Sequence, residues 1–200
     1  MSETLYTLTG LCTHEVEIRK SRFLAQAAPV ESPEAAMAFV DKVRHADANH
    51  DCWAYRIGQA YRFNDDGEPS GSAGKPILAA IDGQQLDCVV AVVTRWFGGI
   101  KLGVGGLIRA YGGTAAECMR RAETVPIIAK TRLTLTCGYA DWPLIKARIQ
   151  PMQATFHGED FGARGVRITL DIADEQVASL RQLVADATHG QGRIIPLDAA

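Results

Sequence analysis

The sequence DCVVAVVTRW, residues 87–96, is nearly all apolar and rich in β-branched side chains. A short apolar run of this kind fits a central strand that is covered on both faces of its sheet. A glycine-rich loop follows it, and the pattern then predicts a helix from about Val104 to Arg121. This strand, loop and helix form the centre from which we assign the first domain.

The residues before this centre combine several predicted strands with one helix. In Ser32-Pro33-Glu34 an N-cap residue precedes a proline, which marks a helix start, and we expect that helix to end near His45. Asp65-Asp66-Gly67 indicates a turn. Strands are expected at residues 5–8, 16–18, 22–28, 52–57 and 61–63.

The residues after Pro126 follow a different pattern. Asp141 is expected to cap one helix, which Pro151 would end. Asp174 is expected to cap a second helix, which would end at Gly190. Alternating apolar residues predict strands at 133–139, 153–157, 166–172 and 193–195.

The element order of this second half, βαββαβ, is that of a ferredoxin-like domain. We therefore expect two α+β domains, residues 1–128 and residues 129–200. The ferredoxin-like fold supports many unrelated activities, so this assignment names no function.

The composition is that of a globular protein, with 47% hydrophobic residues in a chain of 200 and a net charge of −2. The longest apolar run, Cys88–Val93, is far shorter than the roughly 20 residues that a membrane helix needs. No basic segment at the start marks a secretory signal. The five cysteines lack Cys-x-x-Cys spacing, so we expect reduced thiols in a cytoplasmic protein with no membrane partner.

The densest candidate for a binding site is the glycine-rich segment Gly98–Gly113. Its glycines let the backbone approach another surface closely, and amides at the start of the predicted helix favour anions. One interpretation is a surface that contacts phosphate or RNA; the other is tight packing of helix on sheet, with solvated cations. The binding interpretation uses Lys75, Arg95, Gly98, Gly99, Lys101, Gly103, Gly105, Gly106 and Arg109.

A second candidate lies in the segment 64–76, where carboxylates precede a loop of small residues. Asp65, Asp66 and Glu68 could hold Mg²⁺, while the loop amides and Lys75 hold a phosphate. The commoner alternative is a solvated acidic turn. We therefore assign no metal ligand, no catalytic residue and no cofactor, and the order of residues leaves open whether segments 64–76 and 95–113 meet.

One further pair of side chains could carry chemistry. His50 and Cys52 lie two positions apart and would share a face of a strand. A nucleophilic pair also needs direct contact and a third group that orients the histidine. A buried thiol beside a surface histidine is the more common arrangement.

Several stretches of the sequence resemble the IMPACT/YigZ family: Ser21–Phe23 (SRF), His50–Arg56 (HDCWAYR), Asp65–Leu78 (DDGEPSGSAGKPIL), Val93–Gly103 (VTRWFGGIKLG) and Tyr111-Gly112. The resemblance implies an N-terminal domain of the split β-α-β type. It also implies a C-terminal domain like the fifth domain of elongation factor G. Eukaryotic members restrain a stress kinase that targets an initiation factor, by competing for its activator. The resemblance implies no catalytic residues.

These observations leave three functions open. The first is a translation-associated regulator that binds RNA, the ribosome or a translation factor through the glycine-rich basic surface. The second is a Mg²⁺-dependent enzyme that acts on a small phosphorylated metabolite, and the third is a pure protein-interaction module. We expect binding rather than catalysis, and the sequence does not indicate an oligomeric state.

Overall fold

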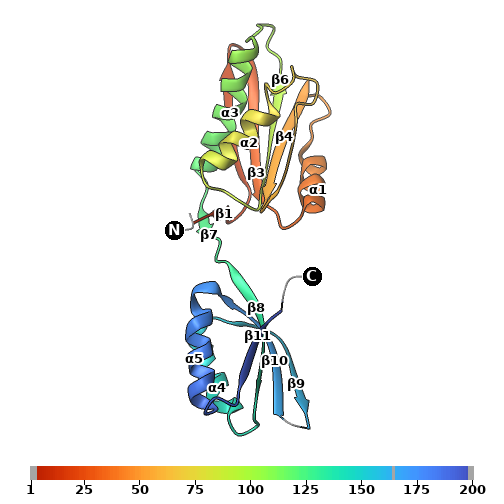
Figure 1. Cartoon of the computed structure of the whole chain (residues 1–200). Coiled ribbons are helices and arrows are strands. Elements are labelled where there is room, and N and C mark those ends of the chain that lie inside the picture. The colour runs from red at the N-terminus through yellow and green to blue at the C-terminus, as the bar shows by residue number, and fades with distance from the viewer. Residues whose placement is uncertain (1–3, 164, 198–200) are drawn as a thin grey trace. The chain divides into compact units, whose positions relative to one another are not determined.

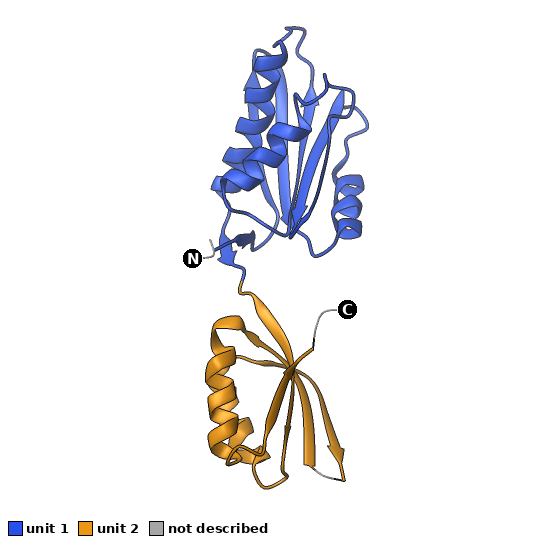
Figure 2. Ribbon diagram, in the orientation of Figure 1, with its two compact units in different colours: residues 1–127 blue, residues 128–200 orange. Residues whose placement is uncertain are grey.

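The computed structural model describes residues 4–163 and 165–197 and divides the chain into two compact units. Unit 1 comprises residues 1–127 and unit 2 comprises residues 128–200 (Figure 2). Both units combine helices with sheets, which confirms the expected α+β architecture. None of the helices in the described residues is long and apolar enough to cross a membrane.

Unit 1 interleaves short strands with three helices. Its elements are, in chain order, β1 (Tyr6–Leu8), β2 (Cys12–Ile18), β3 (Ser21–Pro29), α1 (Pro33–Val43), β4 (His50–Ile57), β5 (Ala60–Asn64), α2 (Gly74–Gly83), β6 (Val89–Trp96), α3 (Val104–Arg120) and β7 (Thr124–Pro126).

The main sheet of unit 1 has five strands in the order β2-β3-β6-β4-β5. Each neighbouring pair is antiparallel, so β3 and β4 run parallel to each other with β6 between them. Because α1 joins β3 to β4, the unit contains the split β-α-β arrangement that the family resemblance implied. The short strands β1 and β7 pair separately.

Helices cover both faces of this sheet, with α2 and α3 on one side and α1 on the other (Figure 1). On the first face Phe23 and Tyr111 lie in the largest apolar cluster. On the second face Val40 packs in a smaller one. The central strand β6 contributes to both, through Val93 and Val92 respectively, so its unbroken apolar run reflects burial on two faces.

Helix α2 differs from the sequence-based expectation for these residues, which was a loop of small residues. Pro76 lies in the first turn, where a proline is tolerated, and Gly83 lies in the last. Ala73 at the N-cap makes no side-chain cap. The helix therefore lacks the local start signal by which α1 was found, where Ser32 accepts a hydrogen bond from the Ala35 amide.

Unit 2 forms a four-stranded antiparallel sheet in the order β11-β8-β10-β9, with α4 and α5 on one face (Figure 1). This strand order and the βαββαβ sequence confirm the ferredoxin-like fold. The elements are β8 (Lys130–Cys137), α4 (Trp142–Ile149), β9 (Thr155–Gly162), β10 (Gly165–Ala173), α5 (Val177–Ala187) and β11 (Arg193–Pro196).

Two expected caps in unit 2 are absent. Asp141 stands at the N-cap of α4 but makes no capping hydrogen bond. Asp174 lies in a 3₁₀ turn before α5, and its carboxylate accepts a hydrogen bond from Thr131 Oγ1 at 2.6 Å. Asp174 therefore ties the connection to β8 instead of capping α5.

Candidate functional site

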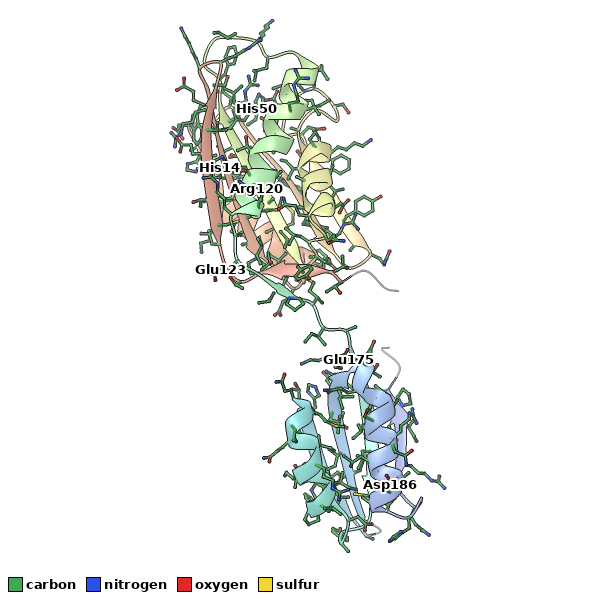
Figure 3. The ribbon with its side chains drawn as sticks, turned by 90° about the vertical axis from the view of Figure 1, so that its left-hand side faces the viewer. His14, His50, Arg120, Glu123, Glu175 and Asp186 are labelled. Atoms are coloured by element: carbon green, nitrogen blue, oxygen red, sulfur yellow. The ribbon has the colours of Figure 1, made fainter. Side chains whose placement is uncertain are left out.

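The distinctive motifs of the sequence meet at one end of the unit 1 sheet. His50 at the start of β4 pairs with Arg95 near the end of β6. The segment 64–76 begins at the end of β5, and the loop 97–103 follows β6, so both leave the sheet at this end. Figure 3 shows His50 here, at the opposite end of the unit from Glu123.

A buried carboxylate joins the two candidate segments. Oε1 of Glu68 lies 2.6 Å from Nη1 of Arg95 and accepts a hydrogen bond from the Tyr111 hydroxyl at 2.7 Å. All three residues are buried, and burial raises the pKa of Tyr111, so its hydroxyl donates as a neutral phenol. Segments 64–76 and 95–113 therefore form one structure, a question that the sequence left open.

This cluster changes the interpretation of Arg95. Its guanidinium was expected to contact phosphate at the surface, but the residue is 5% exposed and paired with Glu68. The guanidinium also lies over the rings of Phe23 and Phe97, at 5.5 and 5.4 Å from their centroids. Arg95 anchors the 64–76 segment to the sheet and is not a surface cation.

The amides at the start of α2 are already occupied by an anion from the chain itself. The carboxylate of Asp65 accepts hydrogen bonds from the backbone amides of Gly71, Ala73 and Gly74 at 2.7, 3.0 and 2.8 Å. Such amides at a helix start are those that would otherwise bind phosphate. Lys75 is exposed beside them, but the phosphate that the sequence suggested for this loop is replaced by Asp65.

The remaining carboxylates of the segment also have separate partners. Oδ2 of Asp66 accepts a hydrogen bond from the backbone amide of Asp51 at 2.7 Å, and Glu68 is held by Arg95. Within the residues that the structure describes, no group of three or more His, Cys, Asp or Glu side chains is placed to hold a metal ion. The alternative of a Mg²⁺ site at Asp65, Asp66 and Glu68 is therefore not supported by this geometry.

His50 and Cys52 do not form a nucleophilic pair. The Cys52 thiol is fully buried and donates to the carbonyl of Asp65 at 3.0 Å. Its burial raises its pKa, which disfavours a thiolate. Nδ1 of His50 lies 2.7 Å from the carbonyl of Asp66. Both side chains hold the segment that follows β5.

A basic groove lies beside this buried cluster, between the β2–β3 turn and the first turns of α3. Its volume is about 260 Å³, and Arg19 and Arg109 line it from opposite elements. Both arginines are exposed, and Lys20 and Lys101 next to the groove in sequence are exposed as well. The apolar and small residues of the lining are Ile18, Leu102, Gly106 and Ala110.

The helix start adds to the positive character of this groove. Gly103, with φ of 71°, stands at the N-cap of α3 and offers no side chain to the amides of the first turn. Those amides carry the positive end of the helix dipole. Arg19 and Lys20 were missed by the sequence analysis, although two basic residues between two predicted strands are a recognisable signal of a cationic turn.

Of the candidate glycines, Gly98 has a clear packing role. A Cβ at this position would lie 1.9 Å from the carbonyl oxygen of Lys20, so only glycine lets the loop after β6 contact the β2–β3 turn. Gly99 has a φ of 85°, a left-handed conformation that glycine adopts readily. Gly105 and Gly106 lie in the first turn of α3, where Gly106 leaves the groove open beside Leu102.

Large apolar side chains are exposed along the same segment. Phe97 and Ile100 lie in the loop, and Val104 and Ile108 follow one helical turn apart on α3. Their exposed fractions run from 40% for Ile100 to 55% for Val104. Isolated apolar residues at a surface are ordinary, but four within 12 positions beside a cationic groove mark a surface suited to binding.

Two family models match the chain. The Impact N-terminal domain matches residues 19–119, which include both candidate segments and every residue of the groove lining except Ile18. A domain of unknown function, DUF1949, matches residues 135–191 in unit 2. Both groove arginines, the buried cluster and the exposed apolar residues lie within the first of these matches.

Whole proteins of the same family are also similar. The Escherichia coli IMPACT family member YigZ is 37% identical over 189 residues, covering 91% of this chain and 92% of that protein. An IMPACT family member of Thermus thermophilus is 57% identical over 111 residues, 56% of this chain and 62% of its own length. A crystal structure described as a hypothetical protein matches with a TM-score of 0.77 and 35% identity, covering 100% of both chains. The chain therefore belongs to the IMPACT family.

Proposed function

We propose that this protein binds single-stranded RNA through the basic groove of unit 1 and thereby regulates translation. The observation that carries the proposal is that Arg19, from the β2–β3 turn, and Arg109, from α3, line the same groove. Both are exposed, and within the described residues neither has an ion-pair partner. They differ in this from Arg95, whose charge Glu68 neutralises.

The chemistry of the groove fits a phosphate of an RNA backbone. Guanidinium groups bind phosphate oxygens through paired hydrogen bonds, and the positive end of the α3 dipole adds to the local field. With a net charge of −2, the chain has no long-range attraction for RNA. The attraction is local and falls steeply as salt rises, because each phosphate contact releases counterions.

An exposed aromatic ring in the loop before α3 favours single-stranded over double-stranded RNA. Phe97 is 46% exposed in the loop that follows β6. Bases of a single strand can stack on such a ring, whereas the bases of a duplex are already stacked on each other. The proposal therefore places a phosphate between Arg19 and Arg109 and a neighbouring base on Phe97.

The regulatory part of the proposal is supported by family membership. The similarity to YigZ covers nearly the whole length of both chains, so both units are shared with that relative. The resemblance that the motifs carry implies a role in translation, where ribosomal and messenger RNA offer exposed phosphates. RNA in the cytoplasm is thus the expected partner, either in isolation or on the ribosome.

The experiment measures binding of a fluorescent single-stranded RNA by anisotropy at several salt concentrations. Arg19→Ala with Arg109→Ala should weaken RNA binding by at least tenfold. The slope of log affinity against log salt concentration should become shallower by about two, one for each arginine removed. The matched control is Arg120→Ala with Arg121→Ala, which removes the same charge from the far end of α3, where Glu117 pairs with both arginines. The control should bind RNA like the unchanged protein.

Equal losses of RNA affinity in the two double variants would contradict binding at the groove, because such losses would reflect the overall charge alone. No binding of RNA or ribosomes at low salt would overturn the proposal. Phe97→Ala should weaken binding to single strands but leave any weak binding to a duplex unchanged, which tests the stacking contact separately.

A second candidate is a protein-interaction surface, favoured by the exposed apolar residues Ile100, Val104 and Ile108. Binding of a partner protein would need these residues, and the partner would still co-purify after nuclease treatment. Val104→Ser with Ile108→Ser should then abolish co-purification of the partner without changing RNA anisotropy. Loss of RNA binding in the arginine variant with retention of the partner would separate the two functions.

A further inference from the structure

Two cysteines that are 106 positions apart in the sequence touch each other in unit 1. Sγ of Cys118, in α3, lies 3.3 Å from Sγ of Cys12, at the start of β2, and donates a hydrogen bond to it. We propose that Cys12 and Cys118 form a reversible disulfide bond when the protein meets a peroxide. This modification would join the edge strand of the main sheet to the longest helix of the unit.

The geometry requires only a small adjustment. A disulfide has an S–S length of about 2.05 Å, so the two sulfurs must approach by little more than an ångström. Cys12 is half-buried and therefore within reach of a small oxidant, whereas Cys118 is 1% exposed. The half-buried sulfur is thus the one that meets the oxidant, and the buried sulfur already lies beside it.

The electrostatics assign the same roles. The hydrogen bond from Cys118 lowers the pKa of Cys12 below the usual value of a thiol, which favours its thiolate. The contact with Cys12 and burial both raise the pKa of Cys118, which keeps its proton. The thiolate is the form that attacks peroxides. Burial instead raises the pKa of Cys52, Cys88 and Cys137.

The reaction proceeds in two balanced steps. The Cys12 thiolate attacks one oxygen of hydrogen peroxide, the O–O bond breaks, and Cys12 becomes a sulfenic acid while the other oxygen leaves as hydroxide, which becomes water. Cys118 then attacks the sulfenic sulfur, loses its proton and displaces the hydroxyl group as a second water. In total, two thiols lose two electrons and one peroxide gains them. A dithiol reductant restores both thiols by exchange.

The disulfide would act on the two elements that form the groove. Cys12 begins β2 and Cys118 lies in the last turn of α3, while the opposite ends of these elements carry Ile18 and Gly106 in the groove lining. Crosslinking one end fixes the spacing of β2 and α3, and with it the freedom of the groove to adapt to a ligand. An effect on RNA affinity rests on the proposed function, whereas formation of the bond does not.

The experiment treats the full chain with a small excess of hydrogen peroxide and then alkylates the remaining thiols. Mass spectrometry should find a loss of two hydrogen masses and a peptide pair joined through Cys12 and Cys118, both reversed by dithiothreitol. Because the bond closes a loop of more than about 100 residues, the oxidised protein should melt at least about 5 °C higher than the reduced one.

Two variants separate this reaction from general oxidation. Cys12→Ser should abolish the mass change and the thermal shift, and it replaces a half-buried residue that the fold tolerates more readily than a change at Cys118. Cys88→Ser, the matched control at the other half-buried thiol, should retain both. Adducts at Cys88 or a sulfinic acid at Cys12, without the joined peptide, would overturn the proposal. A disulfide that leaves RNA anisotropy unchanged would overturn only its coupling to the groove.

Discussion

Glu68 and Arg95 form a buried ion pair, with 2.6 Å between Oε1 and Nη1 and with side chains 4% and 6% exposed. Glu68 lies in the segment after β5 and Arg95 in the central strand, so the pair fastens that segment to the sheet. Tyr111 of α3 donates to the same carboxylate oxygen. Three elements therefore depend on one carboxylate, which gives the acidic motif a structural role.

Glu68→Gln should lower the free energy of unfolding by about 3–5 kcal/mol, because it leaves the Arg95 charge buried without its counterion. Urea denaturation measures the change. The matched control is Glu15→Gln, which breaks an exposed pair with Arg22 and should cost less than about 1 kcal/mol. Similar losses in both variants would show that burial of the Glu68 pair has no energetic consequence.

Asp65→Ala should also destabilise unit 1, because three amides, one in the preceding loop and two at the start of α2, lose their acceptor. We expect a loss of about 2–3 kcal/mol in chemical denaturation, more than the roughly 1 kcal/mol of an ordinary cap. Ser32→Ala, which removes a single capping bond from α1, provides that comparison. Asp65→Asn keeps an acceptor oxygen and should lie between them.

The elements predicted correctly are those whose burial produces a local pattern of apolar residues in the sequence. The unbroken apolar run at 87–96 gave the central strand, and the alternating residues of unit 2 gave its ferredoxin-like order. Helix α2 was not predicted, because the residue that accepts its first amide hydrogen bonds, Asp65, stands nine positions before Gly74 and is not part of a local motif. Its loop was therefore interpreted as a candidate phosphate site, although the chain itself supplies the anion.

The candidate site likewise contains residues that the sequence identified and pairings that it could not reveal. Lys101 and Arg109 were identified from sequence as cations in a glycine-rich segment, and both are exposed. The burial of Arg95 depends on Glu68, which lies 27 positions away, and the contact of Cys12 with Cys118 spans 106. Pairings over such separations are set by the topology of the sheet and leave no periodic signal in the sequence.

The pKa of Glu117 should depend on its two arginine neighbours. Hydrogen bonds from Arg120 and then Arg121 lower it to about 2. A carboxyl with a depressed pKa stabilises the fold above its unfolded value and loses that contribution as the pH falls toward 2. Arg120→Ala with Arg121→Ala should return the pKa toward about 4.3, measured by NMR titration of the carboxyl carbon. An unchanged titration would contradict the assignment of the shift to this triad.

Gly98→Ala tests whether the loop after β6 must touch the β2–β3 turn. The new Cβ would lie 1.9 Å from the Lys20 carbonyl oxygen and 2.0 Å from its carbon, both of them backbone atoms that cannot rotate away. We expect a loss of at least about 2 kcal/mol in urea denaturation and weaker RNA binding, since the turn carries Arg19. Gly113→Ala, inside α3, is the control: its Cβ would meet no atom within 4 Å beyond the backbone of the helix itself, and it should gain roughly 0.5–1 kcal/mol through helix propensity. Destabilisation by both, or by neither, would contradict a close approach confined to Gly98.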